Sequence, residues 1–142
     1  RPKYDPNAPL SRQFSGVHCV RIARDGLVYV CDRSNNRIQV FKKDGTYVEE
    51  IQIAKETVQI GSIWDLVFTL DQKHLLVGDG TNQKIWIVQR QPLKVMGSFS
   101  HAGRMAGELL WVNAMATDSK GNLYTAEVSS GRRVQKFVPV RR

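Results

Sequence analysis

Acidic and basic side chains recur in pairs along this sequence at a near-constant interval. The acids are Asp32, Asp79 and Glu127, and the bases that follow them are Arg37, Lys84 and Arg133. Each pair encloses a short loop rich in Asn, Ser, Thr or Gly, residues that favour tight turns. A charge-assisted hydrogen bond between acid and base would close the mouth of such a loop. We therefore predict three hairpin pairs with a structural role and no catalytic residue among them.

The segments around each pair read as β-strands and repeat about every 47 residues. In the first copy, the turn signal Asp25-Gly26 precedes the apolar run 27–31, and two further strands follow at 38–41 and 46–53. No segment shows the 3.6-residue period of an amphipathic helix. Four antiparallel strands in each repeat predict an all-β fold, a β-propeller built from four-stranded blades.

We expect the whole chain, 1–142, to be a single propeller segment of three blades. Blade 1 is placed at about 16–53, blade 2 at about 62–99, and blade 3 at about 111–138, which is too short for an outer strand. Residues 1–15 contain three prolines and predict an irregular N-terminal arm.

The segment 28–45, Val-Tyr-Val-x-Asp-x-x-x-Asn-Arg-Ile-Gln-Val-Phe-x-x-x-Gly, resembles the NHL repeat. Repeat 17–51 is the nearest match, and the linker 103–110 resembles the Gly-rich segment that often precedes such a repeat. The resemblance extends to uncharacterised bacterial NHL-repeat proteins related to peptidyl-α-hydroxyglycine amidating lyases. Since the family mostly builds six-bladed propellers, it implies that this chain forms half of a ring.

Half a ring would expose two blade faces and one unpaired strand edge, which invites association. Two copies could close a six-bladed ring with two-fold symmetry, as a homodimer, or the chain could be part of a longer propeller, with a monomeric open arc as the third option. Our leading hypothesis is therefore a non-enzymatic binding or assembly module, whose partner is a second copy, the remainder of a longer propeller, or a protein or small ligand at the channel mouth.

The first residues of each inner strand should lie at the mouth of the propeller channel. These positions are His18, Trp64 and Asn113, with Asp65 beside Trp64. If the protein binds a ligand in the channel, we predict that these residues contact it. In the amidating lyases that the chain resembles, histidines at such positions hold a catalytic zinc. His18 matches that pattern and Asn113 departs from it, so the metal site is incomplete. We expect no cofactor, with a degenerate zinc-dependent lyase as the alternative.

The charge and cysteine content leave two further questions open. A net charge of +8 could attract RNA to a basic propeller face, but the basic residues are dispersed along the chain, so nucleic acid is a second alternative only. Cys19 and Cys31 are interpreted as buried thiols in preference to a disulfide. No apolar run reaches the ~18 to 20 residues of a membrane span. We expect a soluble protein without membrane contact, and an extracytoplasmic one if a leader has been removed.

Overall fold

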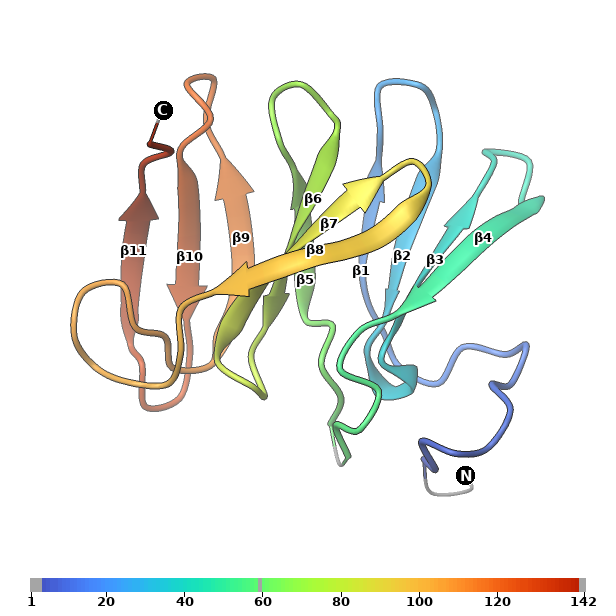
Figure 1. The fold of residues 1–142 in the computed structure, drawn as a ribbon, viewed down its shortest axis with the longest axis horizontal. Coiled ribbons are helices and arrows are strands. Elements are labelled where there is room, and N and C mark those ends of the chain that lie inside the picture. The colour runs from blue at the N-terminus through green and yellow to red at the C-terminus, as the bar shows by residue number, and fades with distance from the viewer. Residues whose placement is uncertain (1–3, 59, 141–142) are drawn as a thin grey trace.

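The computed structural model describes residues 4–58 and 60–140, and within them it contains three antiparallel β-sheets arranged side by side in an arc (Figure 1). Blade 1 consists of β1 (Val17–Ile22), β2 (Val28–Asp32), β3 (Arg37–Phe41) and β4 (Tyr47–Gln52). Blade 2 consists of β5 (Asp65–Phe68), β6 (His74–Asp79), β7 (Lys84–Arg90) and β8 (Leu93–Phe99). Blade 3 consists of β9 (Val112–Thr117), β10 (Leu123–Glu127) and β11 (Arg133–Phe137). A single short 3₁₀ turn, η1 (Arg33–Asn35), lies in the described part, which contains no helix with the length and hydrophobicity of a membrane span.

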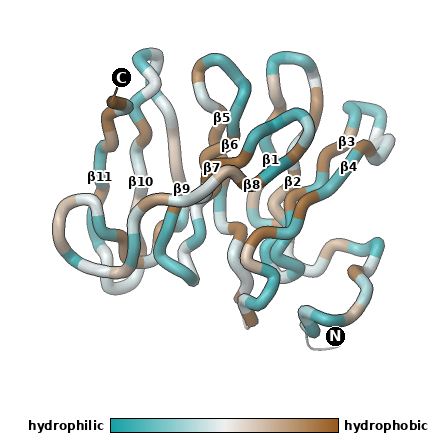
Figure 2. The backbone as a smooth tube through the Cα atoms, in the orientation of Figure 1, coloured by the Kyte–Doolittle hydropathy of each residue, from teal (hydrophilic) through white to brown (hydrophobic). Residues whose placement is uncertain are grey.

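Each sheet is an up-and-down meander in which consecutive strands are neighbours. The turn between the first two strands of blades 1 and 3 reverses direction at Gly26 and Gly121, whose φ angles are +86° and +82°. A left-handed conformation of this kind favours glycine because it has no Cβ atom. The hairpin turns at the upper ends of the strands are mostly hydrophilic, and the hydrophobic stretches lie within the strands (Figure 2).

The inner strand of each blade is its first one, because β1 contacts β5 and β5 contacts β9. One apolar core fills the space between blades 1 and 2, with Tyr29, Leu66 and Leu75 fully buried. A second core lies between blades 2 and 3 around Ile85 and Val112. Strand β2 is buried on both faces at its end, as its continuous apolar run predicts.

The all-β propeller architecture predicted from the repeat is confirmed. In blade 3, β11 is the outermost strand of the sheet among the described residues, whereas blades 1 and 2 have a fourth strand outside the equivalent position. The N-terminal arm follows an irregular path beside blade 1 (Figure 1).

The prediction of two free thiols is wrong, because Cys19 and Cys31 form a disulfide with a Cα–Cα distance of 4.9 Å. The two residues lie directly opposite each other on β1 and β2. Their alignment depends on a β-bulge between Val17 and Cys19, which shifts the register of β1 by one residue. The disulfide joins the inner strand of blade 1 to its neighbour on the side that packs against blade 2.

Candidate functional site

A row of rings contributed by three blades lies where the inner strands begin, at the predicted channel mouth. His18 at the start of β1 lies 5.6 Å from Trp64, and Trp64 lies 5.9 Å from Trp111, measured between ring centroids. The guanidinium of Arg33, from the η1 turn of blade 1, stacks on Trp64 at 4.8 Å from the ring centroid. Burial lowers the pKa of Arg33. Arg33 belongs to this row although it was not predicted as a site residue.

The polar atoms of the mouth are partly occupied by the chain itself. His18 uses Nδ1 to contact the backbone carbonyl of Trp64, and its side chain remains exposed. Trp64 is buried and donates from Nε1 to Gly61 O and to Thr81 Oγ1 at 3.1 Å each. Asn113 lies half-buried on β9. Among the predicted mouth residues, the structure therefore brings His18 against Trp64.

Asp65 connects the inner strands of the three blades. Its carboxylate accepts a hydrogen bond from Arg21 Nη2 on β1 at 2.7 Å and another from the backbone N–H of Met115 on β9 at 2.8 Å. Only 3 % of Asp65 is exposed. Since both carboxylate oxygens have donors, Asp65 serves to hold the arc together at its inner surface, and this contact accounts for its position.

A metal site would need several ligating side chains at one place. Within residues 4–58 and 60–140, no group of three His, Cys, Asp or Glu side chains could hold a metal ion. A catalytic zinc needs three protein ligands and an open position, and His18 is a single imidazole. The donor set of the described residues does not fit zinc, and we derive no chemistry through a metal.

The first hairpin pair is buried and anchors the N-terminal arm. Asp32 Oδ1 accepts the backbone N–H groups of Ser15 and Gly16, both at 3.0 Å, and Oδ2 accepts Asn35 Nδ2 at 2.7 Å and Arg37 Nε at 2.9 Å. Both charged side chains are almost completely buried. The pair therefore closes the loop and also fastens the chain that enters blade 1.

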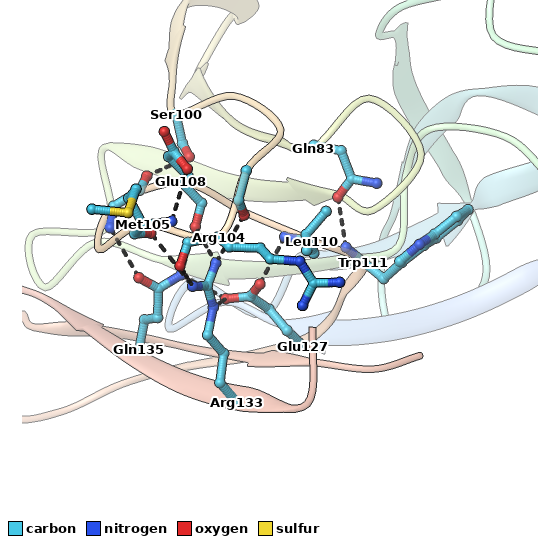
Figure 3. A network of polar contacts seen from close by, with 12 residues as sticks. Gln83, Ser100, Arg104, Met105, Glu108, Leu110, Trp111, Glu127, Arg133 and Gln135 are labelled. Carbon is cyan, nitrogen blue, oxygen red and sulfur yellow. Dashed lines mark hydrogen bonds and ion pairs between the residues drawn. The ribbon is translucent and has the colours of Figure 1, made fainter. Parts of the chain in front are cut away.

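The third hairpin pair has the same role in blade 3 (Figure 3). Arg133 Nε donates to Glu127 Oε1 at 2.9 Å, and Glu127 Oε2 accepts the backbone N–H of Leu110 at 2.7 Å. The guanidinium of Arg133 also donates to carbonyl oxygens of the linker that precedes the blade, which are those of Gly103, Arg104, Met105 and Glu108.

The second predicted pair is built differently. Asp79 and Lys84 are opposite each other in the β6–β7 register, but no ion pair joins them in the described chain. Asp79 instead accepts hydrogen bonds from Asn82 and from Trp86 Nε1, and Lys84 Nζ lies over the Trp86 ring. Burial raises the pKa of Asp79, against the lowering effect of these hydrogen bonds.

The two ends of the arc each present an open blade face. Residues that pack between blades alternate along the strands with residues on the opposite face. On blade 1 the opposite face includes Val20 and Ile22, which are 54 % and 59 % exposed. On blade 3 it consists of small and apolar residues with one lysine, which are Ala114, Ala116, Tyr124, Ala126, Val134 and Lys136.

Comparison with known proteins agrees with this architecture. The NHL repeat profile matches residues 14–41. NHL repeat-containing protein 3 of Homo sapiens is 31 % identical over 132 residues, covering 90 % of this chain and 37 % of the human protein. The Mus musculus protein of the same name is 27 % identical over 140 residues, covering 89 % of this chain and 36 % of its own length. The chain thus spans little more than a third of the curated relatives that it matches.

Solved structures show the same fold at low sequence identity. A streptogramin B lyase structure superposes with a TM-score of 0.64 at 11 % identity, over 99 % of this chain and 45 % of that one. Virginiamycin B lyase from Staphylococcus aureus gives 0.61 at 12 % identity, over 92 % of this chain and 43 % of that one. The repeat profile, the relatives and the three blades lead to one conclusion. The chain carries an NHL repeat at residues 14–41 within a β-propeller-like fold.

Proposed function

We propose that this chain is a non-enzymatic assembly module, an arc of a β-propeller that binds further blades through the open faces of blades 1 and 3. The further blades come from a second copy of the chain or from a longer polypeptide. The observation that carries the proposal is the contrast between equivalent positions on open and buried blade faces.

Val20 of blade 1 is equivalent to Leu66 of blade 2 and Met115 of blade 3. Each of these residues pairs with the residue that lies two positions before the acid at the end of the second strand of its blade. Leu66 and Met115 are 0 % and 7 % exposed, while Val20 is 54 % exposed. Ile22 is equivalent in the same way to Phe68, which packs in the core between blades. Burying an aliphatic side chain contributes about 1.5 to 3 kcal/mol. The blade 1 face is therefore a core surface without its partner.

A cavity on the same face supports this interpretation. It has a volume of about 560 Å³ and lies between the N-terminal arm and the side chains of Phe41 and Tyr47. Gln39 is almost completely buried at its base, and Gln39 Oε1 accepts no hydrogen bond from any described residue. In blade 3, the equivalent Gln135 Oε1 accepts the backbone N–H of Gly107 at 2.9 Å. The Gly107 donor belongs to the linker that precedes blade 3, so Gln39 Oε1 is left to accept a donor from outside the described residues.

Cross-linking of the protein as it occurs in its own cells tests the proposal. Lys43 and Lys136, next to the two open faces, should form cross-links with peptides of propeller blades. Lys94, on the outer strand of blade 2, should not. The substitution Ile22→Glu should abolish the cross-links of Lys43 because it places a charge in the buried contact.

Met96→Glu is the matched control, because Met96 is 54 % exposed but lies on the outer strand β8. The proposal is wrong if Lys43 and Lys136 link only within the arc, or if Ile22→Glu and Met96→Glu have the same effect.

The exposed ring of His18 and the half-buried ring of Trp111, near the half-buried Arg33, favour a second candidate, which is binding of single-stranded RNA at the predicted channel mouth. Bases stack on aromatic rings, and cationic groups bind the phosphates. Affinity for an oligonucleotide should then decrease steeply as salt increases. Binding that is insensitive to salt, or that survives Trp111→Ala, would contradict it.

A further inference from the structure

The boundary between blades 1 and 2 shows which polar groups meet when two blades pack. Asp25, in the turn between β1 and β2, forms an ion pair with Arg90 at the end of β7. Arg90 is 5 % exposed and also donates from Nε to the Tyr29 hydroxyl at 2.8 Å. Val40 of blade 1 is fully buried in the core at this boundary. On this face, blade 1 thus presents a carboxylate, a phenol and an aliphatic side chain to blade 2, and Arg90 of blade 2 binds the first two.

Blade 3 presents the same positions with different residues. The turn 118–122 has the same hydrogen bonds as the turn 23–27, which places Lys120 where blade 1 has Asp25. Tyr124 is equivalent to Tyr29, because each occupies the same place in the second strand of its blade relative to the acid that ends the strand. Lys136 is equivalent to Val40 through its pairing with that tyrosine. The open face of blade 3 therefore carries lysines at positions where blade 1, on the face that packs against blade 2, has an acidic and an apolar residue.

The hydroxyl of Tyr124 is already engaged. It donates to Asp118 Oδ2 at 3.2 Å, and Lys136 Nζ lies over the Tyr124 ring at 5.6 Å from its centroid. A partner arginine at the position of Arg90 would face two ammonium groups, and the neighbouring carboxylate of Asp118 already accepts from Tyr124, Asn122 and the backbone N–H of Lys120. A partner carboxylate would be attracted by both lysines.

We propose that the open face of blade 3 binds a blade that carries an acidic side chain opposite Lys120 and Lys136, and that this blade is not blade 1 of a second copy. The inference rests on the proposed function and deepens it, because it selects the kind of blade that completes the arc. The completing blades have a sequence different from this one.

A second copy would bring a base to this place. Lys43 follows Arg37 at the same interval as Arg90 follows Lys84, so it stands at the position of Arg90. The acids near it are occupied, because Asp44 accepts Thr46 N–H in its own turn and Glu50 accepts Arg37 and Gln39. Like charges would meet at both contacts of a two-fold ring, and each copy has a net charge of +8.

Sedimentation equilibrium of the purified chain tests the inference. The wild-type chain should be monomeric at micromolar concentrations in physiological salt. The double substitution Lys120→Asp and Lys136→Val copies the buried blade 1 pattern onto blade 3 and should strengthen self-association about tenfold or more. The variant Lys94→Asp with Lys55→Val changes the net charge equally at positions away from both faces, and it should remain monomeric.

A circular dichroism spectrum equal to that of wild type confirms that each variant folds. If the double variant does not fold, salt titration of the wild-type chain replaces it, and increasing salt should strengthen its self-association by screening the like charges. A wild-type homodimer at micromolar concentration whose cross-links join Lys136 to Lys43 would overturn the inference and leave the proposed function intact. A double variant that folds and associates no more strongly than wild type would overturn the inference as well. Absence of any partner on either face in the native cross-linking experiment would instead overturn the proposed function.

Discussion

Replacing Asp32 by Asn should destabilise the protein more than the same change at the other buried hairpin aspartate, Asp79. In Asp32, Oδ2 accepts both Asn35 Nδ2 and Arg37 Nε. After the substitution, the NH₂ group of the new amide must either take the place of Oδ2 and face two donors, or displace the backbone contacts of Oδ1. The guanidinium of Arg37 is 1 % exposed and would lose its nearest counter-charge.

Breaking a buried ion pair by removing one partner costs about 3 to 5 kcal/mol. Glu50 remains 3.2 Å from Arg37 Nη1, so we expect the lower value, about 3 kcal/mol. For a chain of this size that loss corresponds to a decrease in Tm of roughly 6 to 12 °C. The measurement is urea denaturation at neutral pH, supported by thermal unfolding of the same samples.

Asp79→Asn is the matched control. Asp79 is equally buried, but no ion pair joins it to Lys84 in the described chain, and burial already raises its pKa. With its oxygen in the place of Oδ2, the new amide still accepts from Asn82 Nδ2 and Trp86 Nε1 and loses only the backbone N–H of the exposed Asn82, so we expect a change of about 1 kcal/mol. The reasoning is refuted if Asp79→Asn costs as much as Asp32→Asn, or if Asp32→Asn costs less than about 1 kcal/mol.

Three further outcomes follow from the disulfide and from perturbed pKa values. Replacing Cys19 and Cys31 together by Ser should cost about 3 kcal/mol from the loop closed by a sequence separation of 12, measured in urea without reductant, and an unchanged midpoint would show that the bond is absent in solution. The pKa of Asp118 should be about 2, mainly because its side chain accepts from Asn122. Its stabilising contribution should therefore be present above its unfolded pKa of about 4 and be lost as pH falls toward 2, which a carboxyl NMR titration of wild type and Asn122→Ala would check. Burial, and then the charge of Glu49, raise the pKa of Tyr29 to about 12, so stability should fall as pH rises from about 10 toward 12, and a phenolate absorbance band for Tyr29 near pH 10 would contradict the packing at the first blade boundary.

The fold could be predicted from the repeat because the period, the apolar strands and the turn residues all indicate the same blade. Asp32 and Glu127 form the ion pairs expected of them, since each faces its base directly across a hairpin. Asp79 does not, because Asn82 and Trp86 from the same hairpin fill its acceptor sites. The loop sequence contains both residues, but their competition with Lys84 depends on side-chain packing.

The disulfide and the mouth residues depended on register and on contacts between blades. Cys19 lies opposite Cys31 only because of a β-bulge in β1, and no residue pattern in that strand predicts the bulge. Asp65 was predicted as a ligand-binding residue, and the structure uses it to join three inner strands. Trp111 lies two residues before Asn113, the position that the repeat aligns with Trp64. The alignment therefore does not predict that Trp111 contacts Trp64, and only its residue type indicates a ring contact.

The accessibility of Val20 in the native assembly tests the central claim most directly. A thiol introduced by Val20→Cys should react rapidly with a maleimide in the isolated chain and at least about tenfold more slowly in the assembled protein, because burial excludes the reagent. The same thiol at Met96→Cys should react equally in both. Equal reactivity of Val20→Cys in the two states would show that no further blade covers the open face of blade 1, and it would contradict the account.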